Sequence, residues 1–174
     1  MLNLIRRFLC AVFLCACVHT AYADRTVKHL GDFMQVMVPV YALGMAMHEH
    51  DWTGVEQFVY SFATTEAIVY GLKFGVQEQR PDGSDNLSFP SGHTAATMSG
   101  ASFIHNRYGI KRAIFPYLMT GFTAYSRIDA NKHWWWDTLA GATISSLVSL
   151  VFVDRYRGVR ILTHPTGVRF AVKF

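Results

Sequence analysis

Apolar residues after residue 24 gather into five segments, which are separated by glycine, proline and charged residues. The segments are Asp32–Met47, Val55–Phe74, His93–His105, Ala113–Tyr125 and Trp136–Val153. Their length and their lack of strict apolar–polar alternation favour helices over strands. The pattern therefore predicts an all-α domain, a bundle of about five helices.

The last residues of the chain follow a different pattern. Val168, Phe170, Val172 and Phe174 occupy every second position directly after a Pro-Thr-Gly sequence. Alternation of period two beside turn-forming residues is typical of a β-hairpin. Residues 159–174 are therefore predicted as a tail with a small C-terminal β-hairpin, outside the helical domain of residues 24–158.

The first 23 residues have the composition of a secretory leader. Two arginines precede an apolar run over residues 8–18, and a small-x-small pattern of the kind that signal peptidase cleaves ends at Ala23. We expect cleavage after Ala23. An uncleaved signal anchor, which would add a sixth helix, and lipidation at Cys17 are the alternatives. All three place the chain in the cell envelope.

Composition excludes several classes of protein. With 51% hydrophobic and 16% charged residues the chain is not disordered, and its formal charge of +4 falls to +2 without the two leader arginines. That surplus is too small for a nucleic-acid-binding protein. The cysteines, Cys10, Cys15 and Cys17, all lie in the leader. The mature chain would therefore have no disulfide, catalytic thiol or cysteine-bound zinc.

Two features favour a membrane-embedded bundle over the alternative, a soluble bundle. The connectors Asn106–Arg112 and Asp154–Arg160 hold the densest Lys and Arg, and an out-in-out-in arrangement puts both in the cytoplasm. Small residues also recur at four-residue spacing, which suits close helix contacts in lipid. They are Ala96 and Gly100, and Gly141, Ser145 and Ser149. In this arrangement, loops 74–90 and 126–135 share the periplasmic face of the cytoplasmic membrane.

The stretch Ser126–Asp137 spaces three functional side chains at fixed intervals: Arg127, His133 and Asp137. Residues four apart on a helix lie on one face, so Asp137 can contact the His133 ring. A carboxylate on one ring nitrogen fixes the tautomer and raises the nucleophilicity of the other nitrogen. The pair is a candidate nucleophile or base, although such pairs are also common on helix surfaces.

The tetrapeptide Pro90–His93 has the features of a helix start. Proline ends the preceding segment, Ser91 is a favourable N-cap, and Gly92 lets the backbone approach a ligand. Free amides at a helix N-terminus bind anions, and His93 in the first turn is placed to give a proton to a group bound there. A plain capped helix is the alternative.

Three basic residues, Lys73, Arg80 and Arg127, lie beside the histidine-bearing segments. Cations that converge on a helix N-terminus match a tetrahedral oxyanion. A metal site formed by the two histidines and Asp137 is disfavoured, because three fixed positive charges would repel a divalent cation. We expect no metal and no cofactor. The sequence His-Glu-His-Asp at residues 48–51 has no fourth metal-binding partner.

Together the three clusters resemble the signature of the type 2 phosphatidic acid phosphatase (PAP2) family, which is related to bacterial class A acid phosphatases and vanadium haloperoxidases. That signature reads Lys, six residues, Arg-Pro; then Pro-Ser-Gly-His; then Ser-Arg, five residues, His, three residues, Asp. All eleven positions match in order. They are Lys73, Arg80, Pro81, Pro90, Ser91, Gly92, His93, Ser126, Arg127, His133 and Asp137.

The resemblance implies a phosphatase that works without a metal. His133, oriented by Asp137, would attack phosphorus to form a phosphohistidine, and His93 would protonate the leaving oxygen. The phosphate-binding residues would be Lys73, Arg80, Ser91, Gly92 and Arg127.

The predicted function is therefore hydrolysis of a lipid phosphate or diphosphate at the periplasmic face of the cytoplasmic membrane. The lipid and the membrane are the expected partners, and nucleic acid is not. A soluble periplasmic acid phosphatase of broad specificity is the main alternative; a vanadate-dependent haloperoxidase and a non-enzymatic envelope protein are less favoured. Because the motif binds the phosphate and not the lipid, it leaves the substrate lipid and the oligomeric state open.

Two details concern the surroundings of this site. Only eight residues, 82–89, separate Arg80-Pro81 from Pro90, fewer than is usual in the family, so we expect a small cap over the site. Trp134, Trp135 and Trp136 either pack around the site or form an interfacial aromatic belt at the level of the lipid headgroups.

Overall fold

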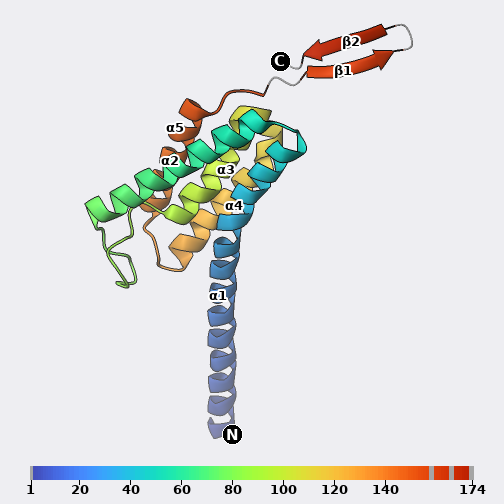
Figure 1. Ribbon diagram of the computed structural model, residues 1–174. Coiled ribbons are helices and arrows are strands. Elements are labelled where there is room, and N and C mark those ends of the chain that lie inside the picture. Colours follow the sequence, from blue (N-terminus) through green and yellow to red (C-terminus); the bar gives the residue numbers. More distant parts are fainter. Residues whose placement is uncertain (1, 157–158, 165–166, 173–174) are drawn as a thin grey trace.

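The computed structural model describes residues 2–156, 159–164 and 167–172, with side chains for residues 25–156. Five helices are followed by two strands (Figure 1). The helices are α1 (Leu2–His48), α2 (Trp52–Val76), α3 (Gly92–Tyr108), α4 (Ile110–Asp129) and α5 (Trp135–Phe152). The strands β1 (Val159–His164) and β2 (Gly167–Val172) pair in antiparallel fashion. The predicted five-helix domain and C-terminal hairpin are both confirmed.

Helix α1 is longer than the segment predicted for it. It begins at Leu2, within the leader, and continues to His48. Its N-terminal half extends away from the other helices, whereas its C-terminal half joins them (Figure 1). Cleavage of the leader, and the domain boundary at residue 23, stay predictions.

Helix α3 lies at the centre of the bundle and packs against each of the other four helices. Its buried residues are mostly small, which lets the neighbouring backbones approach closely. A Cβ atom added at Gly100 would lie 2.9 Å from the Val38 carbonyl oxygen of α1. On the other side, the Ser145 hydroxyl of α5 donates to the Ala95 carbonyl at 2.8 Å. The helix contacts predicted from the small residues are therefore present.

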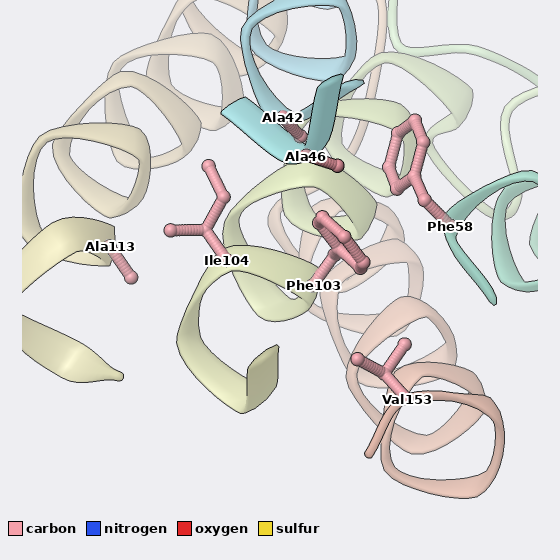
Figure 2. Close-up of a cluster of buried hydrophobic side chains, with 7 residues drawn as sticks. All are labelled: Ala42, Ala46, Phe58, Phe103, Ile104, Ala113 and Val153. Carbon is pink, nitrogen blue, oxygen red and sulfur yellow. The ribbon is translucent and has the colours of Figure 1, made fainter. Parts of the chain in front are cut away.

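An apolar cluster fills one end of the bundle (Figure 2). Its buried members are Ala42, Ala46, Phe58, Phe103, Ile104, Ala113 and Val153. The rings of Phe58 and Phe103 have their centroids 5.0 Å apart, so α2 and α3 interlock here. The cluster joins the end of α1 to the start of α2 and the end of α3 to the start of α4, and it leaves the opposite helix ends free for polar groups.

Elsewhere the bundle reverses the usual distribution of residues. Most of its buried polar side chains carry a hydroxyl: Ser61, Thr65, Ser88, Ser91, Thr94, Thr97, Ser99, Ser102, Thr120, Thr123, Ser126, Thr138, Ser145 and Ser149. Large apolar side chains are exposed on its outside, among them Val40, Val59, Phe74, Phe115, Leu118, Leu139, Leu147 and Leu150. Of the described residues, one segment, Arg25–His48, reaches the length and mean hydropathy of a membrane span, and it lies near the N-terminus.

A buried ion pair ties together the end that carries the basic connectors. Arg107 donates to both carboxylate oxygens of Asp51, at 2.7 and 2.6 Å, and to the Asp154 carbonyl at 2.9 Å. Asp51 also caps α2 by accepting from the Gly54 amide at 3.0 Å. Asp51 is thus fully engaged. Within the described part of the chain, no group of three His, Cys, Asp or Glu side chains is arranged to hold a metal ion.

The close approach at Gly100 leads to a prediction about stability. Gly100→Ala should lower the free energy of unfolding by about 1–3 kcal/mol, because the added methyl group would overlap the Val38 carbonyl. Gly121→Ala is the matched control, since a Cβ atom there meets nothing within 4 Å. Thermal unfolding in detergent measures both variants. A Gly100→Ala protein as stable as the Gly121→Ala protein would contradict the packing described for α1 and α3.

Candidate active site

The predicted site residues come together at the end of the bundle opposite the apolar cluster. Loops 77–91 and 130–134 both lie at this end and are joined by a hydrogen bond from the Asp82 amide to the Asn131 carbonyl at 3.1 Å. A cavity of about 500 Å³ opens between them and the helix ends. Six predicted residues line it: Lys73, Arg80, Gly92, His93, Arg127 and His133. The other two, Ser91 and Asp137, are fully buried beside it.

His133 and Asp137 face each other across the start of α5, with His133 Nδ1 3.4 Å from Asp137 Oδ2. The same carboxylate oxygen accepts the Trp134 amide at 2.9 Å, as expected of an acidic residue in the first turn of a helix. It also accepts the Ser88 hydroxyl at 2.5 Å. The Trp134 amide and the Ser88 hydroxyl therefore hold Asp137 in place, and Asp137 in turn orients the His133 ring.

The opposite nitrogen of His133 shows which tautomer the site favours. Arg80 Nη1 lies 3.3 Å from His133 Nε2. A guanidinium has only donors, so this contact requires a lone pair on Nε2 and places the ring proton on Nδ1, toward Asp137. Nε2 then lies at the cavity with its lone pair available, as a nucleophile requires.

Burial lowers the pKa of His133 below its ordinary range, and the nearby charges of Arg80 and Lys73 lower it further. The hydrogen bond with Asp137 acts in the opposite direction without cancelling these effects. His133 is therefore neutral around pH 7, which keeps the lone pair on Nε2.

Each of the three cations is fixed by contacts with the backbone. Lys73 donates to the Leu87 carbonyl at 2.7 Å, and Arg80 donates to the Lys132 carbonyl at 2.9 Å. Arg127, only 2% exposed, donates to the Lys28 carbonyl of α1 at 2.6 Å. The positive charges therefore stay at the cavity wall in fixed directions, as a preorganised oxyanion site requires.

The start of α3 provides part of the expected anion site. The Ser91 side chain caps the helix by accepting from the Thr94 amide at 3.4 Å, and the Ser91 amide donates to the Asp137 carbonyl at 3.0 Å. The Ser91 amide is therefore already used. The amides of Gly92 and His93 have no hydrogen-bond partner among residues 25–156. The first amides of a helix lack an intrahelical acceptor, so these two are the donors available to an anion.

Sequence reasoning missed several residues that shape this site. Asp85 accepts from Arg80 Nε at 2.7 Å, and Ser88 holds Asp137 as described above. The Glu78 carboxyl contacts Asp137, and its pKa is raised by burial and by that neighbour. Asp32 of α1 contacts both His93 and Arg127. None of these residues is one of the eleven motif positions, and Asp32 lies far from the motif clusters in the sequence, so no local pattern identifies them.

Packing around the site, one of the two predicted roles of the tryptophans, is seen for Trp134 and Trp136. Trp134 Nε1 donates to the Gln79 carbonyl and Trp136 Nε1 donates to Glu78, each at 3.0 Å, so these two rings close the site against loop 77–91. Their rings stack with centroids 5.1 Å apart. Trp135 is 61% exposed, and an interfacial belt stays a prediction.

Comparison with solved structures supports the same fold. The crystal structure of Aquifex aeolicus LpxE matches with a TM-score of 0.64 and 20% identity, covering 75% of this chain and 84% of that one. A transmembrane PAP2 type phosphatidylglycerolphosphate phosphatase from Bacillus subtilis matches with a TM-score of 0.58 and 21% identity, covering 75% and 73%.

Two curated relatives are lipid phosphatases. The chain is 26% identical over 154 residues to a lipid A 4'-phosphatase of Helicobacter pylori, covering 79% of this chain and 75% of the relative. It is 39% identical over 84 residues to a lipid A 1-phosphatase of Porphyromonas gingivalis, covering 47% of this chain and 19% of that longer protein.

The family model and the curated relatives together indicate a phosphatase. The chain belongs to the PAP2 superfamily, whose family model matches residues 55–160.

The environment of His133 leads to a prediction about its titration. In the free protein His133 should titrate below the ordinary histidine range. Arg80→Gln should raise its pKa by removing a nearby positive charge, whereas Asp137→Asn should lower its pKa by removing the carboxylate that stabilises the imidazolium. Histidine-selective NMR in detergent measures these values, with His133→Gln to assign the signal. Shifts of the two variants in the same direction would contradict the description of the site.

Proposed function

We propose that this protein hydrolyses the phosphate of a membrane lipid, through a phosphohistidine and without a metal, at the periplasmic face of the cytoplasmic membrane. One observation carries the proposal. His133 presents a lone pair on Nε2 to a cavity that is walled by Lys73, Arg80 and Arg127. A nucleophile among fixed cations suits attack on a phosphate, whose charge would otherwise repel it.

In the first half of the reaction, His133 Nε2 forms a bond to phosphorus as the bond to the leaving oxygen breaks. His93 gives that oxygen a proton, and the lipid alcohol leaves. The three cations and the amides of Gly92 and His93 bind the remaining phosphate oxygens. Asp137 stabilises the positive charge that develops on the His133 ring.

In the second half, a water molecule attacks the phosphohistidine. His93, now neutral, accepts a proton from that water, and the bond between phosphorus and His133 Nε2 breaks. Inorganic phosphate leaves, and both histidines return to their starting states. The same two histidines therefore exchange roles between the halves of the cycle.

The outside of the bundle supports a lipid environment. Exposed leucine, valine and phenylalanine side chains surround an interior of hydroxyl-bearing and small residues, the distribution expected where lipid replaces water outside the helices. The similarity to lipid A 1- and 4'-phosphatases makes a phosphate of lipid A the first candidate substrate. A soluble acid phosphatase, the alternative, would expose fewer large apolar residues.

The distribution of charge supports the orientation. The connectors that hold Arg107, Lys111, Arg112 and Arg155 lie at the end opposite the cavity. The positive-inside rule assigns that end to the cytoplasm, so the cavity faces the periplasm. The exposed ring of Trp135 lies two residues after His133, at the end of the bundle that carries the site, where an interfacial belt would hold the site at headgroup level.

A substrate panel tests the function. Purified protein with EDTA present should release phosphate from lipid A and other phospholipid monoesters faster than from soluble esters such as glycerol phosphate. Faster hydrolysis of the soluble esters would favour the acid phosphatase instead. Complete loss of activity with EDTA, restored by a divalent cation, would contradict the metal-free mechanism.

The nucleophile has its own test. His133→Ala should reduce turnover by at least about 10³-fold, because the covalent step is removed. Wild-type protein quenched during turnover should carry acid-labile phosphate that is absent from the variant. His105→Ala is the control, since its ring contacts Tyr117 at the other end of the bundle. Substantial activity in the His133→Ala protein, folded as judged by thermal unfolding, would contradict the assignment.

Membrane location and orientation are tested separately. Alkaline carbonate should leave the protein in the membrane pellet, because the apolar exterior is held by lipid rather than by charge. A reporter fused after Gly83 should be active in the periplasm, and one fused after Gly109 in the cytoplasm. Release into the wash would favour the soluble alternative, and reversed reporter signals would contradict the orientation.

A further inference from the structure

Helix α1 contributes to the site although it lies outside the segment that matches the family. The family model begins at residue 55, whereas Lys28, Gly31 and Asp32 belong to α1. Residues 28 and 32 are four apart, so they lie on one face of the helix. That face contacts the end of α4 and the start of α3, beside the cavity.

Asp32 links two groups that act on the phosphate. Its Oδ1 atom accepts from Arg127 Nη1 at 2.7 Å and lies 2.9 Å from His93 Nε2. The Asp32 side chain is 39% exposed at the cavity, whereas the Arg127 side chain is almost fully buried. A single carboxylate oxygen therefore fixes the distance between the proposed proton donor and one of the phosphate-binding cations.

Despite these contacts, Arg127 still has N–H donors available for the substrate. Its five N–H groups include one on Nε, which donates to Ser126 Oγ at 3.2 Å, one that donates to Asp32, and one that donates to the Lys28 carbonyl. One N–H on each terminal nitrogen is left. The two contacts from α1 hold the guanidinium plane while these remaining donors serve the phosphate.

The two histidines of the site use opposite nitrogens for their carboxylates. His133 turns Nδ1 to Asp137, which leaves Nε2 for phosphorus. His93 turns Nε2 to Asp32, and within residues 25–156 its Nδ1 has no hydrogen-bond partner. We propose that Asp32 is a positioning residue for His93 and Arg127, so that α1 is part of the catalytic unit and His93 exchanges protons through Nδ1.

The proton balance follows from this arrangement and rests on the proposed function. In protonated His93, the Nε2–H group makes a hydrogen bond to Asp32 and keeps its proton. The Nδ1 proton is transferred to the leaving oxygen. The neutral ring keeps the Nε2 proton, held by Asp32, and so has its lone pair on Nδ1. That lone pair then accepts the proton of the attacking water, which restores the starting state.

Gly31 allows α1 to come this close. A Cβ atom at residue 31 would lie 2.0 Å from Ser126 Oγ and 2.9 Å from Arg127 Nη2. Any side chain larger than glycine would therefore push α1 away from the end of α4 and separate Asp32 from Arg127. Gly44 of the same helix faces open space, since a Cβ atom there meets nothing within 4 Å.

Leaving-group dependence provides the test. Asp32→Ala and Gly31→Ala should slow hydrolysis of an alkyl phosphate about 10–100-fold more than that of p-nitrophenyl phosphate, because only the poor leaving group needs the proton from His93. Asp32→Glu should recover part of the loss. Gly44→Ala and Glu56→Gln, an exposed acidic residue at the other end of the bundle, should match wild type. Equal losses with both esters, or none, would overturn the inference.

A second measurement separates this inference from the proposed function. Nitrogen NMR of labelled histidine in the free protein should show neutral His93 protonated on Nε2, and Asp32→Ala should shift that preference toward Nδ1. Neutral His93 protonated on Nδ1 in the wild-type protein would overturn the role of Asp32. Wild-type protein that hydrolyses no phosphate ester would instead contradict the proposed function, whatever the tautomer of His93.

Discussion

The hydrogen bonds around Asp137 hold the whole site in register. Its side chain accepts from Ser88 of loop 77–91 and from the amide of Trp134, and it faces His133; its carbonyl accepts from the Ser91 amide at the start of α3. A buried carboxylate is stable only when such donors surround it. The loop, α3 and α5 therefore cannot move apart without leaving that buried charge without its hydrogen-bond donors, and the geometry of the nucleophile depends on this constraint.

The rest of the bundle serves to bring helix ends together. Small residues let α3 approach its four neighbours, and the apolar cluster fixes the far end, so that four helix termini and two loops meet at the cavity. The interior is rich in hydroxyl groups, several of which donate to carbonyls of their own or neighbouring helices, as with Ser145 and Thr120. Such an interior gains little from burial away from water, which is why close packing and not apolar burial dominates its cohesion.

Sequence alone predicted the five helices, the hairpin and the eight proposed site residues, because these rest on local patterns: apolar runs, period-two alternation and fixed spacings within short clusters. It underestimated the length of α1, because the leader and the segment that follows it form one continuous helix. It also missed Asp32, Ser88 and Glu78. Their roles come from contacts across the bundle, and an isolated Asp, Ser or Glu carries no signal of its partner. It listed Ser91 among the phosphate-binding residues, and the structure shows that the Ser91 amide donates to the Asp137 carbonyl.

Trp134 and Trp136, which stack on each other, and the neighbouring Trp135 make intrinsic fluorescence a probe of one part of the protein. Three of its four tryptophans lie at the start of α5 beside His133, and the remaining one, Trp52, starts α2 at the opposite end. Two of the three indole N–H groups are bonded to loop 77–91, so movement of that loop changes the polarity around the rings. Intrinsic fluorescence of the unlabelled protein is therefore dominated by the start of α5 beside loop 77–91, and quenchers confined to a chosen depth of the bilayer can locate this end of the bundle relative to the lipid.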